Sequence, residues 1–170
     1  MAAGYITWVE KGYGLIEALN AAGVSKEHRD GGAWVSDVAR AQAVIDGYTL
    51  DQSKAYKQRQ VRVHAKRQRD LVVADVSRGE TAAWPLKVLE VAAYARSGDP
   101  ADAPLLSDEA RDRLISLPEL IVKVEASKAD FAALEAKIAG IDGRHRDAIA
   151  ACSTFEDVAA YDFSTGWPGV

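Results

Sequence analysis

Cysteine, methionine, proline and phenylalanine are all scarce in this sequence. Its 170 residues include one cysteine, one methionine, five prolines and three phenylalanines. A single cysteine excludes an internal disulfide and a cysteine zinc site. No apolar run reaches the roughly 18 residues that a membrane span needs, and no signal peptide opens the chain. We therefore expect neither a disulfide scaffold nor a membrane protein.

The charges are nearly balanced. There are 21 lysines and arginines against 25 acidic residues, which gives a net charge of −4. This balance argues against a general nucleic-acid or membrane-surface binder. Hydrophobic residues make up 48% of the chain, so it can bury a core without disulfides or structural metals.

The first 50 residues carry the only strand-like patterns. Residues 5–9 form a β-branched and aromatic run, and Ala33-Trp34-Val35 forms a second short run. Residues 15–22 between them have helical spacing, with Gly23 as a stop. Residues 28–32 favour a loop, and Ser36 is a good N-cap for a helix that continues to residue 48. We expect residues 1–50 to form a small α/β unit.

Helices are expected over most of the remaining chain. One should run from Asp51 to Ser77, and another should have Pro85 in its first turn. Ser107 indicates the start of a short helix. Two S-x-x-E spacings, Ser116 to Glu119 and Ser153 to Glu156, indicate capping boxes.

A heptad repeat follows the first of these boxes. Its two seam positions are mostly apolar over about five repeats. We expect Phe131 and Ile138 to be buried, and close backbone packing to explain Gly140 and Gly143. The first seam position holds Leu117, Val124, Phe131, Ile138, His145 and Cys152, and the second holds Leu120, Ser127, Leu134, Ile141 and Ala148.

Residues 54–69 form an unusually basic helix, with seven cations and no acid. The cations point all round the helix, which favours a match with acidic protein surface, within the chain or on a partner, over phosphate-backbone binding. Arg62 and Arg69 are the candidate contact residues. In a parallel pair of heptad helices Lys123 would meet Lys128 and Asp130 would meet Glu135, both unfavourably, whereas Lys137 would meet Asp142 favourably. The balance favours an antiparallel partner, most simply this basic helix.

No pattern predicts catalysis, a cofactor or a metal. His28, His64 and His145 show no metal-binding spacing. His145 is expected to be a hydrogen-bonded seam residue, with a pH-sensitive contact as the alternative. Cys152 has no local base that would form a thiolate, so we expect it to be a small buried thiol. We therefore expect a protein that is not an enzyme.

The chain ends in an aromatic segment without periodicity. Tyr161, Phe163 and Trp167 fall within seven residues, and Gly166 and Pro168 keep the segment out of regular structure. Three exposed rings would be an aggregation liability, so the segment should either fold back on its own helices or dock on a neighbouring subunit.

These patterns predict a mainly α fold: a helical hairpin or small bundle with a long heptad-patterned helix, preceded by the α/β unit. The expected domains are residues 1–50, a helical domain over 51–152, and a short helix with an aromatic tail over 153–170.

Several segments suggest a family. Trp84 to Glu90, Ala92-Ala93-Tyr94, and then Asp99, Ala103 and Pro104 resemble a helix and proline loop of small tailed-bacteriophage tail proteins. Leu120, Lys128, Ile138-Ala139-Gly140-Ile141 and Arg144 look like the helix that follows in those proteins. Tail-fibre and tail-tip proteins have short segments similar to residues 42–48, Tyr161-Asp162 and Gly166-Trp167-Pro168. The likeness covers about two thirds of the chain.

The resemblance implies a structural virion component of the tail, at the baseplate, tail tip or fibre attachment, made in the host cytoplasm. It implies contacts with other phage tail proteins, a possible homo-oligomer, and no catalytic residue. Two alternatives stay open: a tail-fibre assembly chaperone that leaves the particle, and a DNA-contacting head–tail or packaging protein that uses the basic helix 54–69.

Overall fold

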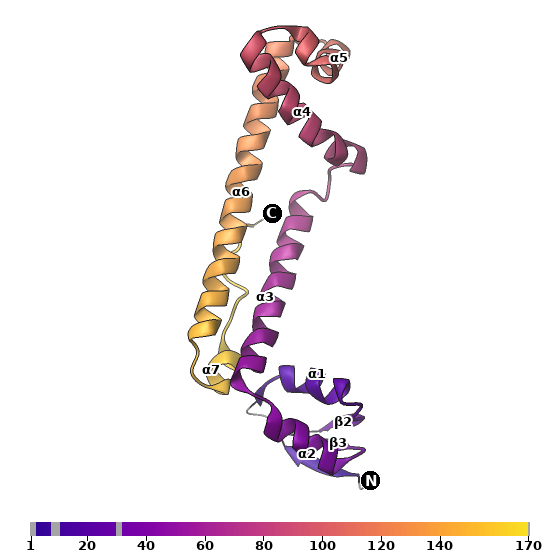
Figure 1. Ribbon diagram of the computed structural model, residues 1–170, viewed down its shortest axis with the longest axis vertical. Coiled ribbons are helices and arrows are strands. Elements are labelled where there is room, and N and C mark those ends of the chain that lie inside the picture. The colour runs from indigo at the N-terminus through magenta and orange to yellow at the C-terminus, as the bar shows by residue number, and fades with distance from the viewer. Residues whose placement is uncertain (1–2, 8–10, 30–31, 170) are drawn as a thin grey trace. The chain divides into compact units, whose positions relative to one another are not determined.

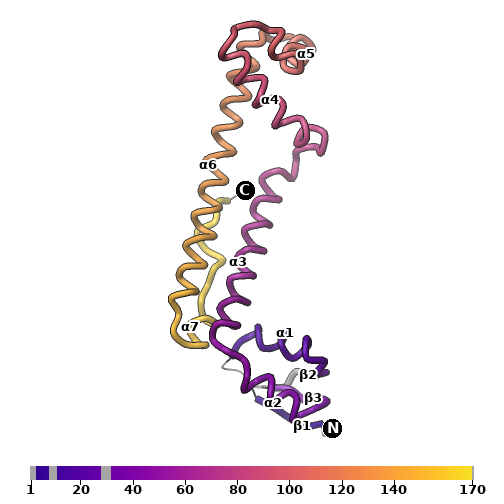
Figure 2. Tube along the Cα trace, in the orientation of Figure 1, coloured from indigo at the N-terminus to yellow at the C-terminus, as the bar shows by residue number. Residues whose placement is uncertain are grey.

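The computed structural model describes residues 3–7, 11–29 and 32–169. Seven α-helices and three strands lie within these residues, so the expected mainly α fold is confirmed (Figures 1 and 2). The contacts divide the chain into two compact units. The first holds residues 1–67 and 140–167, and the second holds residues 68–139 and 168–170. The predicted boundaries after residues 50 and 152 stay predictions.

The N-terminal part of the first unit is a three-stranded antiparallel sheet with two helices. The strands β1 (Gly4–Thr7), β2 (Lys26–Arg29) and β3 (Gly32–Val35) lie in the order β1-β3-β2, with Tyr5 and Glu27 both opposite Trp34. Helices α1 (Gly14–Ala21) and α2 (Val38–Gly47) are part of the same unit.

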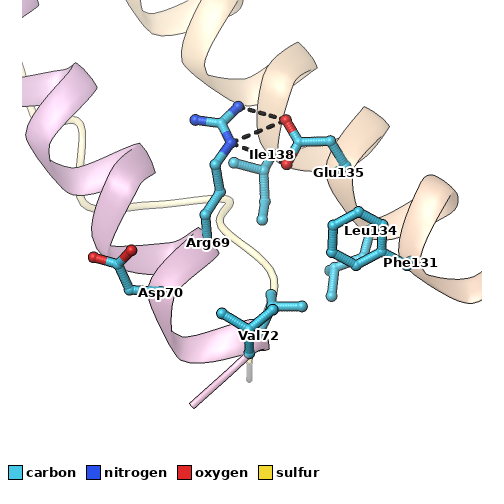
Figure 3. A pocket seen from close by; sticks show the side chains of 8 residues that line it. Arg69, Asp70, Val72, Phe131, Leu134, Glu135 and Ile138 are labelled. Atoms are coloured by element: carbon cyan, nitrogen blue, oxygen red, sulfur yellow. Dashed lines mark hydrogen bonds and ion pairs between the residues drawn. The ribbon is translucent and has the colours of Figure 1, made fainter. Parts of the chain in front are cut away.

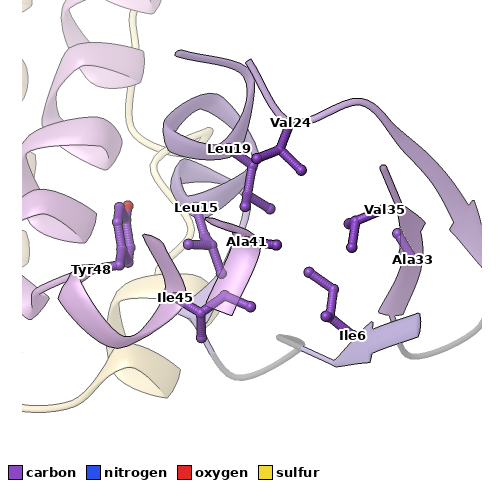
Figure 4. Close-up of a cluster of buried hydrophobic side chains, with 9 residues drawn as sticks. All are labelled: Ile6, Leu15, Leu19, Val24, Ala33, Val35, Ala41, Ile45 and Tyr48. Carbon is purple, nitrogen blue, oxygen red and sulfur yellow. The ribbon is translucent and has the colours of Figure 1, made fainter. Parts of the chain in front are cut away.

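Alternation along these strands creates the core of this α/β region. Ile6, Ala33 and Val35 lie on the buried face of the sheet, because side chains alternate between its two faces. They share one cluster with Leu15 and Leu19 of α1, and with Val24, Ala41, Ile45 and Tyr48 (Figure 4). The predicted α/β unit is thus confirmed.

Two local expectations in this region are wrong. His28 and Arg29 belong to strand β2, because their backbone pairs with Ala33 and Gly32, and the rest of the predicted loop includes Asp30 and Gly31, which lie outside the described residues. The N-cap of α2 is Asp37, one residue after Ser36, and its carboxylate accepts a hydrogen bond from the Arg40 N–H. Residues 8–10 of the predicted first strand also lie outside the described residues.

The long helices are α3 (Leu50–Val72) and α6 (Leu117–Ala151). In the first unit they run antiparallel: the Lys54 ammonium donates to the Ala150 carbonyl at 2.8 Å, and the Gln58 amide donates to the Arg146 carbonyl at 3.0 Å. The basic helix therefore packs against the heptad helix of its own chain. A short helix, α7 (Phe155–Ala160), follows α6.

The second unit contains α4 (Arg78–Ser97), a 3₁₀ turn (Pro100–Asp102) and α5 (Pro104–Asp112). Its core joins one side of α4, α5 and the start of α6, through Val91, Ala103, Leu106, Ala110, Leu120, Ile121 and Val124. The Glu90 carboxylate is buried and accepts hydrogen bonds from the Leu105 and Leu106 N–H groups at 3.2 and 2.9 Å. It thereby satisfies two free donors in the first turn of α5.

Helix boundaries depart from expectation where a cap residue was not recognised. Helix α3 ends at Val72 rather than Ser77, because Ser77 adopts an extended backbone and caps α4 by accepting from the Glu80 N–H. As a result Pro85 lies in the interior of α4, not in its first turn.

Two further N-caps are displaced from the predicted serines. Helix α5 begins at Pro104, so Ser107 lies inside the helix and donates to the Pro100 carbonyl. Thr154, not Ser153, caps α7, in a capping box with Asp157. Ser116 does accept from the Glu119 N–H at the start of α6, as predicted.

The heptad seam is buried at both ends and open in the middle. Leu120, Val124, Ile138 and Ile141 are buried, whereas Phe131 is 48% exposed. The expected burial of Phe131 is therefore wrong. The expected close packing at Gly140 and Gly143 is also wrong, because a Cβ added at either would meet no atom within 4 Å.

Candidate functional site

The aromatic segment after α7 folds onto α3 and α6 within the first unit. His145 of α6 is 3% exposed, and its two ring nitrogens lie 2.8 Å from the Tyr161 hydroxyl and 3.1 Å from the Thr165 carbonyl oxygen. Since a carbonyl only accepts, Nε2 carries the proton, and in the neutral ring Nδ1 accepts from Tyr161. His145 is thus the hydrogen-bonded seam histidine that the sequence predicts.

The other two aromatic rings of the segment pack on side chains of α3 and α6, Trp167 beside His145 and His64, and Phe163 beside His64 and Lys57. The Trp167 ring lies 5.6 Å from the His145 ring and 5.0 Å from the His64 ring, and its indole N–H donates to the Phe163 carbonyl at 2.7 Å. The Phe163 ring lies 5.5 Å from the Lys57 ammonium. The three candidate aromatic residues thus serve internal packing, and their role in partner binding stays a prediction.

The cations of α3 contact helix ends and acidic side chains. Besides Lys54, the Lys57 ammonium reaches a C-terminal carbonyl, that of Ala159 at 3.1 Å, where the helix dipole favours positive charge. Burial lowers the pKa of Lys57 from its ordinary value. Arg59 forms an ion pair with Glu17 of α1. Arg62 is exposed.

Arg69 and Glu135 join the end of α3 to α6 in the second unit. The guanidinium donates to both carboxylate oxygens of Glu135 at 2.7–2.9 Å (Figure 3). These hydrogen bonds hold the pKa of Glu135 below its ordinary value. Arg69 thus has an acidic contact within its own chain, of the kind that the charge pattern predicts.

An apolar hollow opens next to this ion pair. A small hollow of about 200 Å³ is bounded by the pair, and four of its lining residues, Val72, Val73, Phe131 and Leu134, also line a larger hollow of about 530 Å³. The walls of the larger hollow are further lined by Val76, Trp84 and Pro85, and the polar residues Glu80, Thr81, Ser127 and Asp130 also line it. Val73, Val76 and Phe131 are 37%, 39% and 48% exposed, so the hollow faces solvent.

Sequence reasoning did not predict this hollow. The sequence pattern places Val72, Val73 and Val76 in one continuous helix, and it places Phe131 in a closed seam. One sequence signal could have predicted it. Ser77 and Glu80 form a third S-x-x-E spacing, which indicates that a new helix starts there and that the preceding helix ends near these valines.

The described residues contain no cluster of metal-binding side chains. Nowhere in residues 3–7, 11–29 and 32–169 do three or more histidine, cysteine or acidic side chains gather as a metal site would require. Cys152 is half-buried, and its Sγ lies 3.5 Å from the Ala148 carbonyl oxygen. None of the helices in the described part of the chain combines the length and apolar character needed to cross a bilayer.

Comparison with known proteins adds no relative: no family model, no curated protein and no solved structure matches this chain.

Proposed function

We propose that this protein is a structural component of a bacteriophage tail, at the baseplate, tail tip or fibre attachment, and that it acts through protein–protein contacts and not as an enzyme. The observation that carries the proposal is the open apolar hollow of the second unit. A solvent-facing hollow with a half-exposed phenylalanine at its edge is typical of a surface that docks another protein.

The residues that carry the resemblance to phage tail proteins support this role. Glu90 binds the backbone at the start of α5, and Trp84 and Tyr94 pack against the core of the second unit. Tyr161 and Trp167 pack around His145. All of these side chains make internal contacts that hold the fold together, which a structural component requires.

The proposal is tested by quantifying the protein in purified particles, with tail-less particles from the same preparation as the control. A fixed copy number in tailed particles, and none in tail-less ones, is the expected result. Presence only in infected-cell lysate, with none in tailed particles, would instead favour the tail-fibre assembly chaperone.

The DNA-contacting alternative rests on the exposed part of the basic helix, where Arg62 lies. It requires duplex binding that weakens steeply between about 50 and 200 mM salt. We expect no such binding, and we expect an Arg62→Glu variant to enter particles as the unaltered protein does. Tight, salt-sensitive binding that Arg62→Glu abolishes would favour this alternative.

A further inference from the structure

Three segments of the second unit line the larger hollow. From α6 come Ser127, Asp130, Phe131 and Leu134, whose spacing places them on one face of the helix. From the first turns of α4 come Glu80, Thr81, Trp84 and Pro85, and from the end of α3 and the turn after it come Val72, Val73 and Val76. The hollow extends over only about two turns of α6, so it has room for one bulky side chain and its neighbours but not for a helix laid along it.

The lining of the two hollows is acidic. Four carboxylates, those of Asp70, Glu80, Asp130 and Glu135, stand against one guanidinium, that of Arg69. Arg69 is already bound to Glu135. Glu80 and Asp130 are exposed, and among the residues that the structure describes neither takes part in an ion pair. The larger hollow therefore carries one negative charge from α4 and one from α6, with no lysine or arginine among its described lining residues.

The openness of the hollow favours a protein as its occupant over a small molecule. Pockets for small molecules bury most of the surface of their ligand. Here Val73, Val76 and Phe131 are 37%, 39% and 48% exposed, so a small ligand would remain largely in water. A partner protein can insert one apolar side chain and cover the edge of the hollow with the surface around it.

We propose that this hollow receives a short segment of a partner protein in which one bulky apolar side chain is flanked by lysine or arginine. The apolar side chain packs on Val73, Trp84 and Phe131, and the flanking cations reach the carboxylates of Glu80 and Asp130. The faces of the two aromatic rings also attract cations. This inference rests on the proposed function, since it specifies the chemistry of one contact through which a tail component would assemble.

The test uses three matched tripeptides, blocked at both ends, as probes: Lys-Phe-Lys, Glu-Phe-Glu and Lys-Ala-Lys. Binding to the purified full chain is followed by the NMR shifts of the valine methyl groups that line the hollow. We expect Lys-Phe-Lys to bind with a Kd of about 1 mM and the other two to bind about tenfold more weakly. The glutamate peptide lacks the matching charge, and the alanine peptide lacks the apolar side chain.

Substitutions at the hollow separate charge from shape. Asp130→Lys should remove the preference for the lysine peptide, and Glu80→Lys combined with Asp130→Lys should reverse it. Ser127→Trp fills the hollow without a change of charge and should abolish the binding of both phenylalanine peptides. Glu125→Lys, at an exposed position of α6 that does not line the hollow, is the matched control and should bind like wild type.

Circular dichroism melts of each variant confirm that it folds. No binding of Lys-Phe-Lys at about 10 mM, equal affinity for the lysine and glutamate peptides, or unchanged binding by Ser127→Trp would each overturn the proposal. Self-association of the wild-type chain that Ser127→Trp abolishes would place a second copy in the hollow and would overturn it too. The purified protein decides this inference and particle composition decides the proposed function, so the failure of one is distinguishable from the failure of the other.

Discussion

At the scale of single residues, burial separates side chains that occupy equivalent heptad positions. Phe131 and Ile138 are both first-seam residues on α6, yet Ile138 is 1% exposed and Phe131 is 48% exposed. Hydrophobic stabilisation follows the area removed from water. The smaller side chain is therefore the more important one for stability.

Alanine substitution should reveal this difference. We expect Ile138→Ala to lower the free energy of unfolding by about 2–5 kcal/mol, since it leaves a cavity in a closed core. Phe131→Ala should cost only about 1 kcal/mol, because half of the ring is already in water. Urea unfolding of the two variants measures both losses, and equal losses would contradict the open seam.

At the scale of elements, glycine has opposite roles at the end of one helix and inside another. Gly98 ends α4 in the left-handed conformation, with φ of +70°, and its N–H donates to the Tyr94 carbonyl. Gly140 lies inside α6, where an added Cβ would meet no atom within 4 Å. Only the first position needs the freedom of glycine.

The same substitution should therefore have opposite signs at the two glycines. Gly98→Ala should destabilise the protein by about 1 kcal/mol, because an L side chain is strained in the left-handed region. Gly140→Ala should stabilise it by about 1 kcal/mol, since alanine favours helix. Thermal melts of the two variants provide the measurement. Destabilisation by Gly140→Ala would mean that a neighbouring segment approaches α6 there.

Helices α4 and α5 are joined by a partly buried ion pair whose strength depends on pH. The Lys87 ammonium lies 2.7 Å from a Glu109 carboxylate oxygen, and this hydrogen bond, helped by Arg113, lowers the pKa of Glu109 below its ordinary 4.5. A carboxyl whose pKa is lower in the folded state stabilises the fold above its unfolded pKa. That stabilisation is lost as the pH falls through the folded pKa.

Removal of the ammonium should weaken this pH dependence. We expect wild type to lose about 1 kcal/mol more than Lys87→Met as the pH falls from about 5 to about 3. Urea unfolding at several pH values checks this. Arg111→Met is the control, because Arg111 pairs with Asp108 on the exposed side of α5. The same acid sensitivity in Lys87→Met as in wild type would show that the pair does not matter.

At the scale of the whole molecule, residues far apart in the sequence are held together by the end of the chain. The segment from Tyr161 to Trp167 supplies both hydrogen-bond partners of the buried His145 and a ring beside His64 of α3. Without it a buried imidazole would lose its partners, which is costly in a low-dielectric interior.

Truncation after Ala160 should therefore destabilise the isolated protein. We expect a loss of at least about 3 kcal/mol, or about 10 °C in Tm, from the hydrogen bonds and the buried aromatic area. Truncation after Pro168 keeps Tyr161, Thr165 and Trp167 and should have little effect. An unchanged melt of the shorter chain, together with its failure to enter particles, would make the segment an assembly anchor instead.

The sequence by itself determined the elements whose signals are local. Helical periodicity, the β-branched runs near Ile6 and Trp34, and the Ser116 cap each depend on neighbouring residues, so they could be predicted. The candidate aromatic residues could also be selected, because three rings in a non-periodic segment are conspicuous in any sequence.

Only the tertiary structure decided which of these residues are covered. A heptad pattern does not reveal where a partner helix stops, so Phe131 and Ile138 looked alike in the sequence. Likewise, the sequence alone suggests that Glu90 is a surface acid. In the fold its carboxylate is buried, because the free N–H groups at the start of α5 donate to it. Burial depends on which distant segments meet, and that is decided by the packing of the whole chain and not by local spacing.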